Sequence, residues 1–352
     1  MKKSDFTASR RSFLAGTAGA LMASAVLGPA RAAAKSDTVT IINYGGSYQD
    51  ATVKAVFEPF TKETGIKVEN VPVPGLDKIK AMELTGNVEI DIFIGPGTWA
   101  ASGSKQGFWE KLDLSMLDLK DLAIQPTNED VTYEVVTMGI AWDPKKFGPG
   151  KHPSDFVEYF DLKKFPGRRC FRPVPDQTLE AALLADGVAP KDLYPLDLDR
   201  AFKSLNRIKS SIVWAQTVPQ TIFLVQRGEV DFTYTSVNRI KATNDEGGGV
   251  PLAFSFDQNL IITDSLGILK GAPNKENAMK LIAYILRPEV QARLYDLLGL
   301  LPASTKAKAL MSEAARKWLP DLSNPKNVTI SSEYWANNFE KVNPRFLEWI
   351  QS

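Results

Sequence analysis

The chain has 352 residues, 44% of them hydrophobic, and its 42 lysines and arginines nearly balance 41 aspartates and glutamates. A single cysteine and a single histidine exclude a disulfide framework or a Cys/His zinc site within one chain. The net charge of +1 argues against a nucleic-acid partner, because such proteins normally carry a basic surplus. We expect no metal and no cofactor.

Residues 1–34 have the three parts of an export signal. A basic start contains Arg10 and Arg11 before Ser-Phe-Leu, an apolar stretch runs to about Leu27, and small residues end at Ala34. The paired arginines match the twin-arginine export pattern, which predicts a periplasmic protein. A membrane-spanning helix is the alternative, but glycines and a proline dilute the apolar stretch. The body that remains after this basic segment is mildly acidic.

The next part of the chain alternates strands and helices. The β-branched run 39–42 predicts a strand that ends at Gly45-Gly46, and apolar spacing predicts a helix from Ser47 or Tyr48 to Gly65. Further strands are expected at 66–68 and 89–94. This alternation predicts a mostly parallel sheet with helices on both faces.

The middle and the C-terminal part continue the same pattern. Strands are expected at 135–142, 228–235 and 264–269, and helices at 178–186, 198–210, 275–286 and 288–298. The last fifty residues are mixed, with Trp318, Tyr334, Trp335 and Trp349 as expected packing anchors.

Several runs in this order resemble the periplasmic solute-binding proteins of ABC importers, specifically the spermidine/putrescine-binding branch. The matching runs are Asn43–Asp50, Phe57–Val68, Gly139–Trp142, Lys164–Gly167, Gly228–Asp231, Asp264–Leu266 and Lys270–Ala278. The run Phe-Glu-Pro-Phe with Glu-Thr-Gly-Ile is the most specific of them, although it says little about the ligand.

The resemblance implies an α/β protein with the type II periplasmic-binding-protein fold. Two lobes, each a mostly parallel sheet flanked by helices, would be joined by a hinge of two crossing strands. Lobe one would comprise 38–140 plus 264–352, and lobe two 141–263. A monomer would trap a small organic solute between the lobes and deliver it to an inner-membrane ABC permease and its ATPase, without acting as an enzyme. Ligands of open α/β sheets sit beyond the carboxyl ends of strands, which agrees with this arrangement.

Aromatic residues are the first candidates for ligand contact. By resemblance, Tyr44 and Tyr48 stand where the family has aromatics that sandwich a ligand, and such rings attract cations. The alternative is that either ring is packed in the core. Tyr234 stands where polyamine binders keep a tryptophan, and Ser236 follows it toward the same cleft.

Two loops add polar candidates. Ser47 begins a predicted helix, where backbone N–H groups favour an anion, although a plain glycine turn also explains the sequence. Thr98 and Trp99 follow the third strand, where the family has a Ser/Tyr-containing loop. Thr98 could hydrogen-bond a ligand, whereas Trp99 either covers the ligand or packs a helix onto the sheet.

The charged candidates point to the ligand class. Asp264 matches the aspartate with which the family grips a ligand ammonium, or else it bonds local backbone. A second family carboxylate is replaced by Gln177, and Arg172 adds a positive charge nearby. One carboxylate suits one amine, and Arg172 could clamp a ligand carboxylate or lie on the surface. We therefore expect a small organic amine, either polyamine-like or zwitterionic. The departures point to a ligand with one amine, or with one amine and one acid, such as an amino acid, a γ-amino acid or an opine-like compound.

Two other classes of function stay open. A receptor for a phosphonate or sulfonate would use Ser47 and Arg172. A secreted hydrolase is the weakest alternative, because no Gly-x-Ser-x-Gly motif occurs and His152 lies in a turn-like stretch. Cys170 is expected to be a buried, inert thiol.

Overall fold

The computed structural model describes residues 37–352, so the predicted signal peptide at 1–34 lies outside the described residues. Within this range the strands are β1 (Thr38–Asn43), β2 (Lys67–Pro72), β3 (Ile92–Pro96), β4 (Asp130–Trp142), β5 (Arg169–Phe171), β6 (Ile212–Trp214), β7 (Phe232–Ser236), β8 (Ala253–Phe254), β9 (Leu260–Ile268), β10 (Leu301–Pro302) and β11 (Val328–Thr329).

The α-helices of the described residues are α1 (Gly46–Thr52), α2 (Glu58–Thr64), α3 (Leu76–Thr85), α4 (Gly97–Gln106), α5 (Phe156–Tyr159), α6 (Pro175–Ala185), α7 (Leu198–Asn206), α8 (Gln220–Gln226), α9 (Val237–Asn244), α10 (Lys275–Ile285), α11 (Pro288–Leu298), α12 (Thr305–Leu310), α13 (Glu313–Arg316) and α14 (Ser332–Gln351). Short 3-10 turns occur at Leu114–Met116, Leu119–Asp121, Pro190–Asp192 and Lys209–Ser211, and a π-helical turn, η1, at Val53–Phe57.

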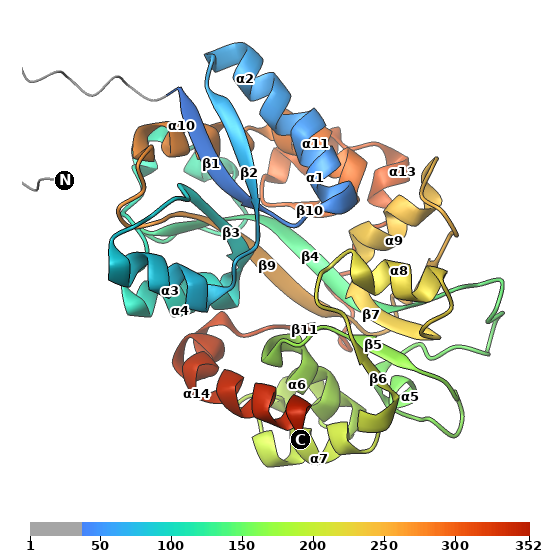
Figure 1. Cartoon of the computed structure of the whole chain (residues 1–352). Helices are drawn as coiled ribbons and strands as arrows, with labels where there is room; N and C mark the ends of the chain where they lie inside the picture. Colours follow the sequence, from blue (N-terminus) through green and yellow to red (C-terminus); the bar gives the residue numbers. More distant parts are fainter. Residues whose placement is uncertain (1–36) are drawn as a thin grey trace, which may run out of the picture. The chain divides into compact units, whose positions relative to one another are not determined.

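All strands join one mixed sheet in the order β2-β1-β3-β9-β4-β7-β5-β6, with β8 and β10 beside β4 and β11 beside β9. The two ends of this sheet are parallel: β1 pairs in parallel with β2 and β3, and β5 with β6 and β7. The long strands β4 and β9 run antiparallel to each other between those ends (Figure 1).

The predicted fold class is confirmed, with two parallel sheet regions joined by two crossing strands. Because β4 and β9 pair with strands on both sides, the two regions form one continuous sheet rather than two separate ones. The expected lobe boundaries at 140/141 and 263/264 fall inside β4 and β9, and they stay a prediction.

The first helix follows the sequence prediction with one irregularity. The chain is helical from Gly46 to Thr64, and Gly65 ends it in the left-handed conformation at φ 74°. Pro59 lacks an N–H group and its ring crowds the carbonyl of the residue four before it, which here is Ala55. Ala55 lies within the π-helical turn, so the proline explains why the regular hydrogen-bond ladder is interrupted there.

The C-terminal helix α14 was not predicted. Its buried residues Trp335, Phe339, Val342 and Phe346 recur at helical spacing, but Pro344 and neighbouring polar residues obscured that pattern. The helix packs on α4 and α6, and Trp335 is fully buried as expected for an anchor. Among residues 37–352, no helix combines the length and the hydropathy that a membrane crossing requires.

Candidate ligand-binding site

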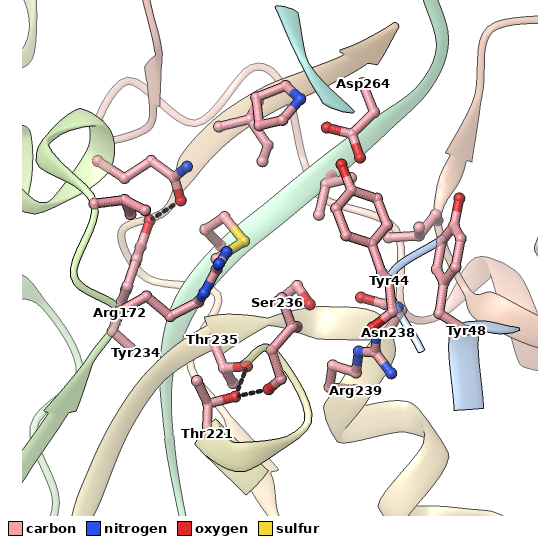
Figure 2. A pocket seen from close by; sticks show the side chains of 18 of the residues that line it. Tyr44, Tyr48, Arg172, Thr221, Tyr234, Thr235, Ser236, Asn238, Arg239 and Asp264 are labelled. Carbon is pink, nitrogen blue, oxygen red and sulfur yellow. Dashed lines mark hydrogen bonds between the residues drawn. The ribbon is translucent and has the colours of Figure 1, made fainter. Parts of the chain in front are cut away.

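A cavity of about 80 Å³ lies at the carboxyl ends of β1, β3 and β7, against the crossing strands (Figure 2). Its lining combines aromatic, acidic, basic and apolar side chains. They are Tyr44, Tyr48, Pro96, Glu134, Val136, Met138, Arg172, Val174, Gln177, Thr178, Val218, Thr221, Tyr234, Thr235, Ser236, Asn238, Arg239, Ile262, Asp264 and Leu300.

The turn after β1 brings two tyrosines to the cavity. Gly45 and Gly46 both have positive φ, at 68° and 55°, which lets the chain reverse directly into α1. The rings of Tyr44 and Tyr48 meet edge to face with centroids 5.3 Å apart. Tyr48 is 2% exposed, and its hydroxyl points away from solvent toward the crossing strands. Both predicted tyrosines therefore line the cavity, and Tyr48 is also part of the core.

Two carboxyl groups face each other across the crossing strands. Glu134 on β4 is the register partner of Asp264 on β9, and both side chains are buried. A β-bulge between Thr132 and Glu134 places Tyr133 and Glu134 toward the same region. The hydroxyls of Tyr48 and Tyr133 lie 3.0 and 3.1 Å from Glu134 Oε1. Glu134 was not among the predicted site residues, although an acid next to an apolar and β-branched strand was a usable signal.

Burial governs the protonation of this acid pair. It raises the pKa of Glu134 well above its usual range, and the neighbouring charge of Asp264 raises it further. Burial likewise raises the pKa of Asp264 to about 6, opposed by the Tyr44 hydroxyl and the Glu134 carboxyl beside it. No salt bridge of the described residues involves either acid, and Glu134 Oε2 and Asp264 Oδ1 lack a hydrogen-bond partner there.

Arg239 in the first turns of α9 joins the cavity to the glycine turn. Its guanidinium donates hydrogen bonds to the carbonyls of Gly45 (2.9 Å) and Tyr44 (3.3 Å) and to Ser47 Oγ (3.4 Å). Burial lowers its pKa to about 10, so it stays cationic at neutral pH. Its Nε has no partner among residues 37–352. Arg239 was not among the predicted site residues, because nothing in the local sequence shows that α9 meets a turn almost 200 residues earlier.

Arg172 enters the cavity from the segment between β5 and α6, and Gln177 enters it from the start of α6, where the backbone is not helical. No hydrogen bond or ion pair within residues 37–352 involves the Arg172 guanidinium. Gln177 has φ 74°, a conformation that no other non-glycine residue of the described chain adopts. Its side-chain oxygen accepts a hydrogen bond from the Tyr234 hydroxyl at 3.3 Å. In Figure 2, Asp264 lies beside the Tyr44 hydroxyl and well apart from Arg172.

Seven of the ten predicted site residues line the cavity, and three lie behind it. Ser47 contacts Arg239, and the Thr98 hydroxyl donates to Asp176 Oδ2 at 2.9 Å. Trp99 packs edge to face on Phe339 of α14 with ring centroids 6.1 Å apart, as its packing alternative anticipated. Thr98 and Trp99 point elsewhere because β3 continues through Pro96, so that both are already within helix α4.

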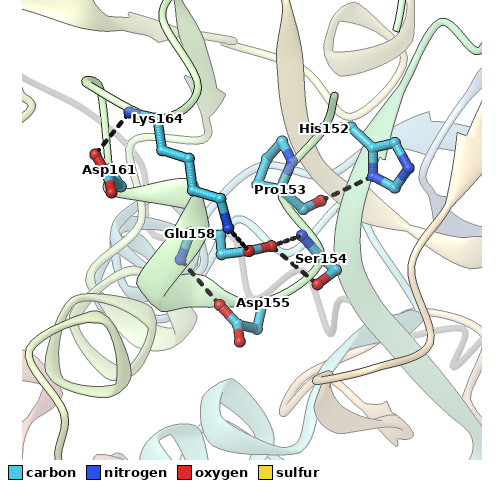
Figure 3. A network of polar contacts seen from close by, with 7 residues as sticks. All are labelled: His152, Pro153, Ser154, Asp155, Glu158, Asp161 and Lys164. Atoms are coloured by element: carbon cyan, nitrogen blue, oxygen red, sulfur yellow. Dashed lines mark hydrogen bonds and ion pairs between the residues drawn. The ribbon is translucent and has the colours of Figure 1, made fainter. Parts of the chain in front are cut away.

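His152 and Cys170 lie outside the cavity lining. The ring of His152 stacks on Trp142, with centroids 3.6 Å apart, and its Nδ1 lies 3.4 Å from the Pro153 carbonyl. The neighbouring Ser154 hydroxyl donates instead to Glu158 (Figure 3). Cys170 is buried, and burial raises its thiol pKa to about 11, which keeps it protonated.

A family described as bacterial extracellular solute-binding proteins matches residues 55–320. The chain belongs to this family. A gamma-aminobutyric acid-binding protein of Pseudomonas aeruginosa is 30% identical over 91% of this chain and 93% of its own length. The spermidine/putrescine-binding periplasmic protein of Escherichia coli is 22% identical over 94% of this chain and 96% of its own length.

A solved structure supports the same membership. The periplasmic binding protein AgtB of A. tumefaciens R10, in complex with agropinic acid, superposes with a TM-score of 0.83. It is 32% identical and covers 90% of this chain and 99% of its own. The predicted resemblance is thus confirmed. The extracellular solute-binding family and these relatives are transport components that bind small solutes, rather than enzymes.

Proposed function

We propose that this protein is the periplasmic receptor of an ABC importer for a small zwitterion that carries one ammonium and one carboxylate. The observation that carries the proposal is that one cavity holds two buried acids, the buried Arg239 and the partly buried Arg172, without ion pairs between acids and arginines. Asp264 and Glu134 would bind the ammonium, while Arg172 and Arg239 would bind the carboxylate. Buried charges are costly when unpaired, so a ligand with both charges completes each side.

The relatives support this ligand class. They include a gamma-aminobutyric acid-binding protein and an agropinic acid complex, and both ligand names describe compounds with an acid group. A diamine would leave the two arginines without a counter-charge. A γ-amino acid or an opine-like compound therefore matches the cavity better than a polyamine does.

The transport role adds expectations about location and partners. We propose export through the twin-arginine route, a monomeric periplasmic form, and delivery of the solute to a permease with its ATPase. Replacing Arg10 and Arg11 by lysines should block export. Fractionation would then find the precursor in the cytoplasm, whereas continued periplasmic accumulation would contradict this route.

Calorimetry with four related solutes tests the ligand class. Gamma-aminobutyrate should bind. Butylamine lacks the carboxylate, butyrate lacks the ammonium, and putrescine has a second ammonium where the carboxylate should be. Each of these three should bind at least about 30-fold more weakly, because an unpaired buried charge costs about 2 kcal/mol or more. An opine-type N-substituted amino acid extends the series to larger zwitterions.

Two results would contradict the proposal. Binding of phosphonates or sulfonates instead of every amine would favour an anion receptor. Conversion of the bound solute into a new product would indicate an enzyme, whereas a receptor returns the ligand unchanged.

A further inference from the structure

Glu134 and Asp264 are two adjacent buried acids, whereas the proposed ligand brings only one ammonium to them. Their Cα atoms are register partners on adjacent antiparallel strands, so the side chains project to the same face. Glu134 is 0% and Asp264 3% exposed, and no cation forms an ion pair with either within residues 37–352. Two neighbouring buried carboxylates cannot both ionise cheaply, so such a pair keeps one proton.

The tyrosine and aspartate side chains around the pair add no positive charge to it. The facing hydroxyls belong to Tyr44 and Tyr48 of the first turn and α1, Tyr133 of β4 and Tyr295 of α11. Burial raises the pKa of all four tyrosines, so they stay neutral donors. Asp176 adds further negative charge near Asp264.

Arg239 interacts electrostatically with Glu134, but its hydrogen bonds go to Gly45, Tyr44 and Ser47 instead. No cation within residues 37–352 neutralises the pair directly, and the ammonium of a ligand could supply that charge.

We propose that Glu134 and Asp264 share one proton before the ligand binds and release it when a ligand ammonium takes its place. This inference rests on the proposed zwitterion ligand and adds a role for Glu134. The step conserves charge at the acid pair: the ligand ammonium brings one positive charge to the two carboxylates and one proton leaves to solvent. The ligand carboxylate brings its negative charge to the arginines, so the net charge of the whole cavity falls by one. No covalent bond of the ligand is made or broken. An ammonium has three N–H donors, enough to reach both carboxylates.

Calorimetry with gamma-aminobutyrate in buffers of different ionisation enthalpy measures the released protons directly. We expect a release that approaches about one proton per ligand near pH 7, and affinity that rises with pH by up to about tenfold per unit. Glu134→Gln should abolish the release, because Asp264 alone binds the ammonium without a shared proton. Glu129→Gln, just before β4 and outside the cavity, should leave the release unchanged.

A second measurement does not depend on variants. In the infrared difference spectrum of the wild-type protein, adding the ligand should remove the carbonyl stretch of one protonated carboxylic acid. Tight binding with no proton release and no loss of that band would overturn the exchange while leaving the proposed function intact. If neither gamma-aminobutyrate nor an opine-type zwitterion binds, the proposed function and the exchange both fail.

Discussion

Asp264 and Arg172 both face the cavity without an ion-pair partner among residues 37–352. Their surroundings differ, because Asp264 has tyrosine hydroxyls and a second acid beside it, whereas Arg172 extends from a loop. Each residue is therefore expected to recognise one end of the ligand, and each can be tested separately.

Asp264→Asn should weaken gamma-aminobutyrate binding by at least about 30-fold, because removal of one partner from a buried charge pair costs about 2–5 kcal/mol. Isothermal calorimetry on the folded variant measures the loss. Asp257→Asn is the matched control, since Asp257 is exposed just before β9. Unchanged affinity in Asp264→Asn would remove this residue from the amine site.

Arg172→Gln should distinguish the contributions of the ligand's carboxylate and ammonium to the binding affinity. It should weaken gamma-aminobutyrate by about tenfold or more yet leave the weak binding of butylamine unchanged, because butylamine has no carboxylate to pair. Competition or calorimetric titration gives both affinities. Arg168→Gln, an exposed arginine four residues earlier, serves as control. Equal losses for both solutes would point to a structural role instead.

At the scale of elements, Glu180 connects three parts of the chain beneath the cavity. Its carboxylate accepts hydrogen bonds from the backbone of Gln177 and from the side chains of Tyr194 and Trp335, all at 2.7 Å. It thereby holds the left-handed turn that aims Gln177 into the cavity and fastens α14 to α6. Burial raises the pKa of Glu180 to about 7.

This raised pKa makes stability depend on pH with a definite sign. The contribution of Glu180 is fully present below its unfolded pKa of about 4.5 and is lost as pH rises through about 7. Relative to Glu180→Gln, the unfolding free energy of the wild type should fall by about 3 kcal/mol over this window. Urea unfolding at pH 5 and pH 8 measures the difference. Glu289→Gln, an exposed control, should show the same pH dependence of the unfolding free energy as the wild type. The same pH dependence in Glu180→Gln would contradict the raised pKa of Glu180.

The elements that the sequence predicted are those with a complete local signal. β1 has a β-branched run, and the helix after it ends at a glycine in the left-handed conformation. Glu134 and Arg239 were not predicted as cavity residues, because their place in the cavity depends on contacts with residues far away in the sequence. The pairing of Glu134 with Asp264 spans 130 residues, and no local pattern encodes such a register. The order of motifs therefore predicted the fold, while about half of the charged cavity lining needed the structure.

At the scale of the whole described chain, Arg239 connects the segments predicted as two lobes. Its guanidinium contacts the turn after β1 so closely that a Cβ on Gly46 would lie 3.2 Å from Arg239 Nη1. The same residue lines the cavity. A ligand carboxylate beside it would therefore be coupled to the contact between the two segments.

Arg239→Lys should speed ligand dissociation by about tenfold or more, because a lysine keeps the charge but cannot span two carbonyls with a planar fork. Stopped-flow displacement measures the rate, and Arg227→Lys, exposed after α8, is the control. Gly46→Ala should act in the same direction by displacing the guanidinium. An unchanged dissociation rate in both cavity variants would show that this contact does not retain the ligand.

The location of the acid pair on β4 and β9 has a mechanical consequence. Both parallel sheet regions share these two strands. Glu134 and Asp264 would therefore lie at the axis of any rotation of one sheet region relative to the other. Arg172 and Arg239 belong to residues 141–263, the segment predicted as lobe two. If the predicted lobes rotate about these strands, the distance between the two charges of a ligand would set the closure angle, because closure would continue until the arginines contact the ligand carboxylate. Solutes of different length should therefore hold the lobes at different closure angles. Only one distance between the ammonium and the carboxylate would then give the closed conformation that a permease binds.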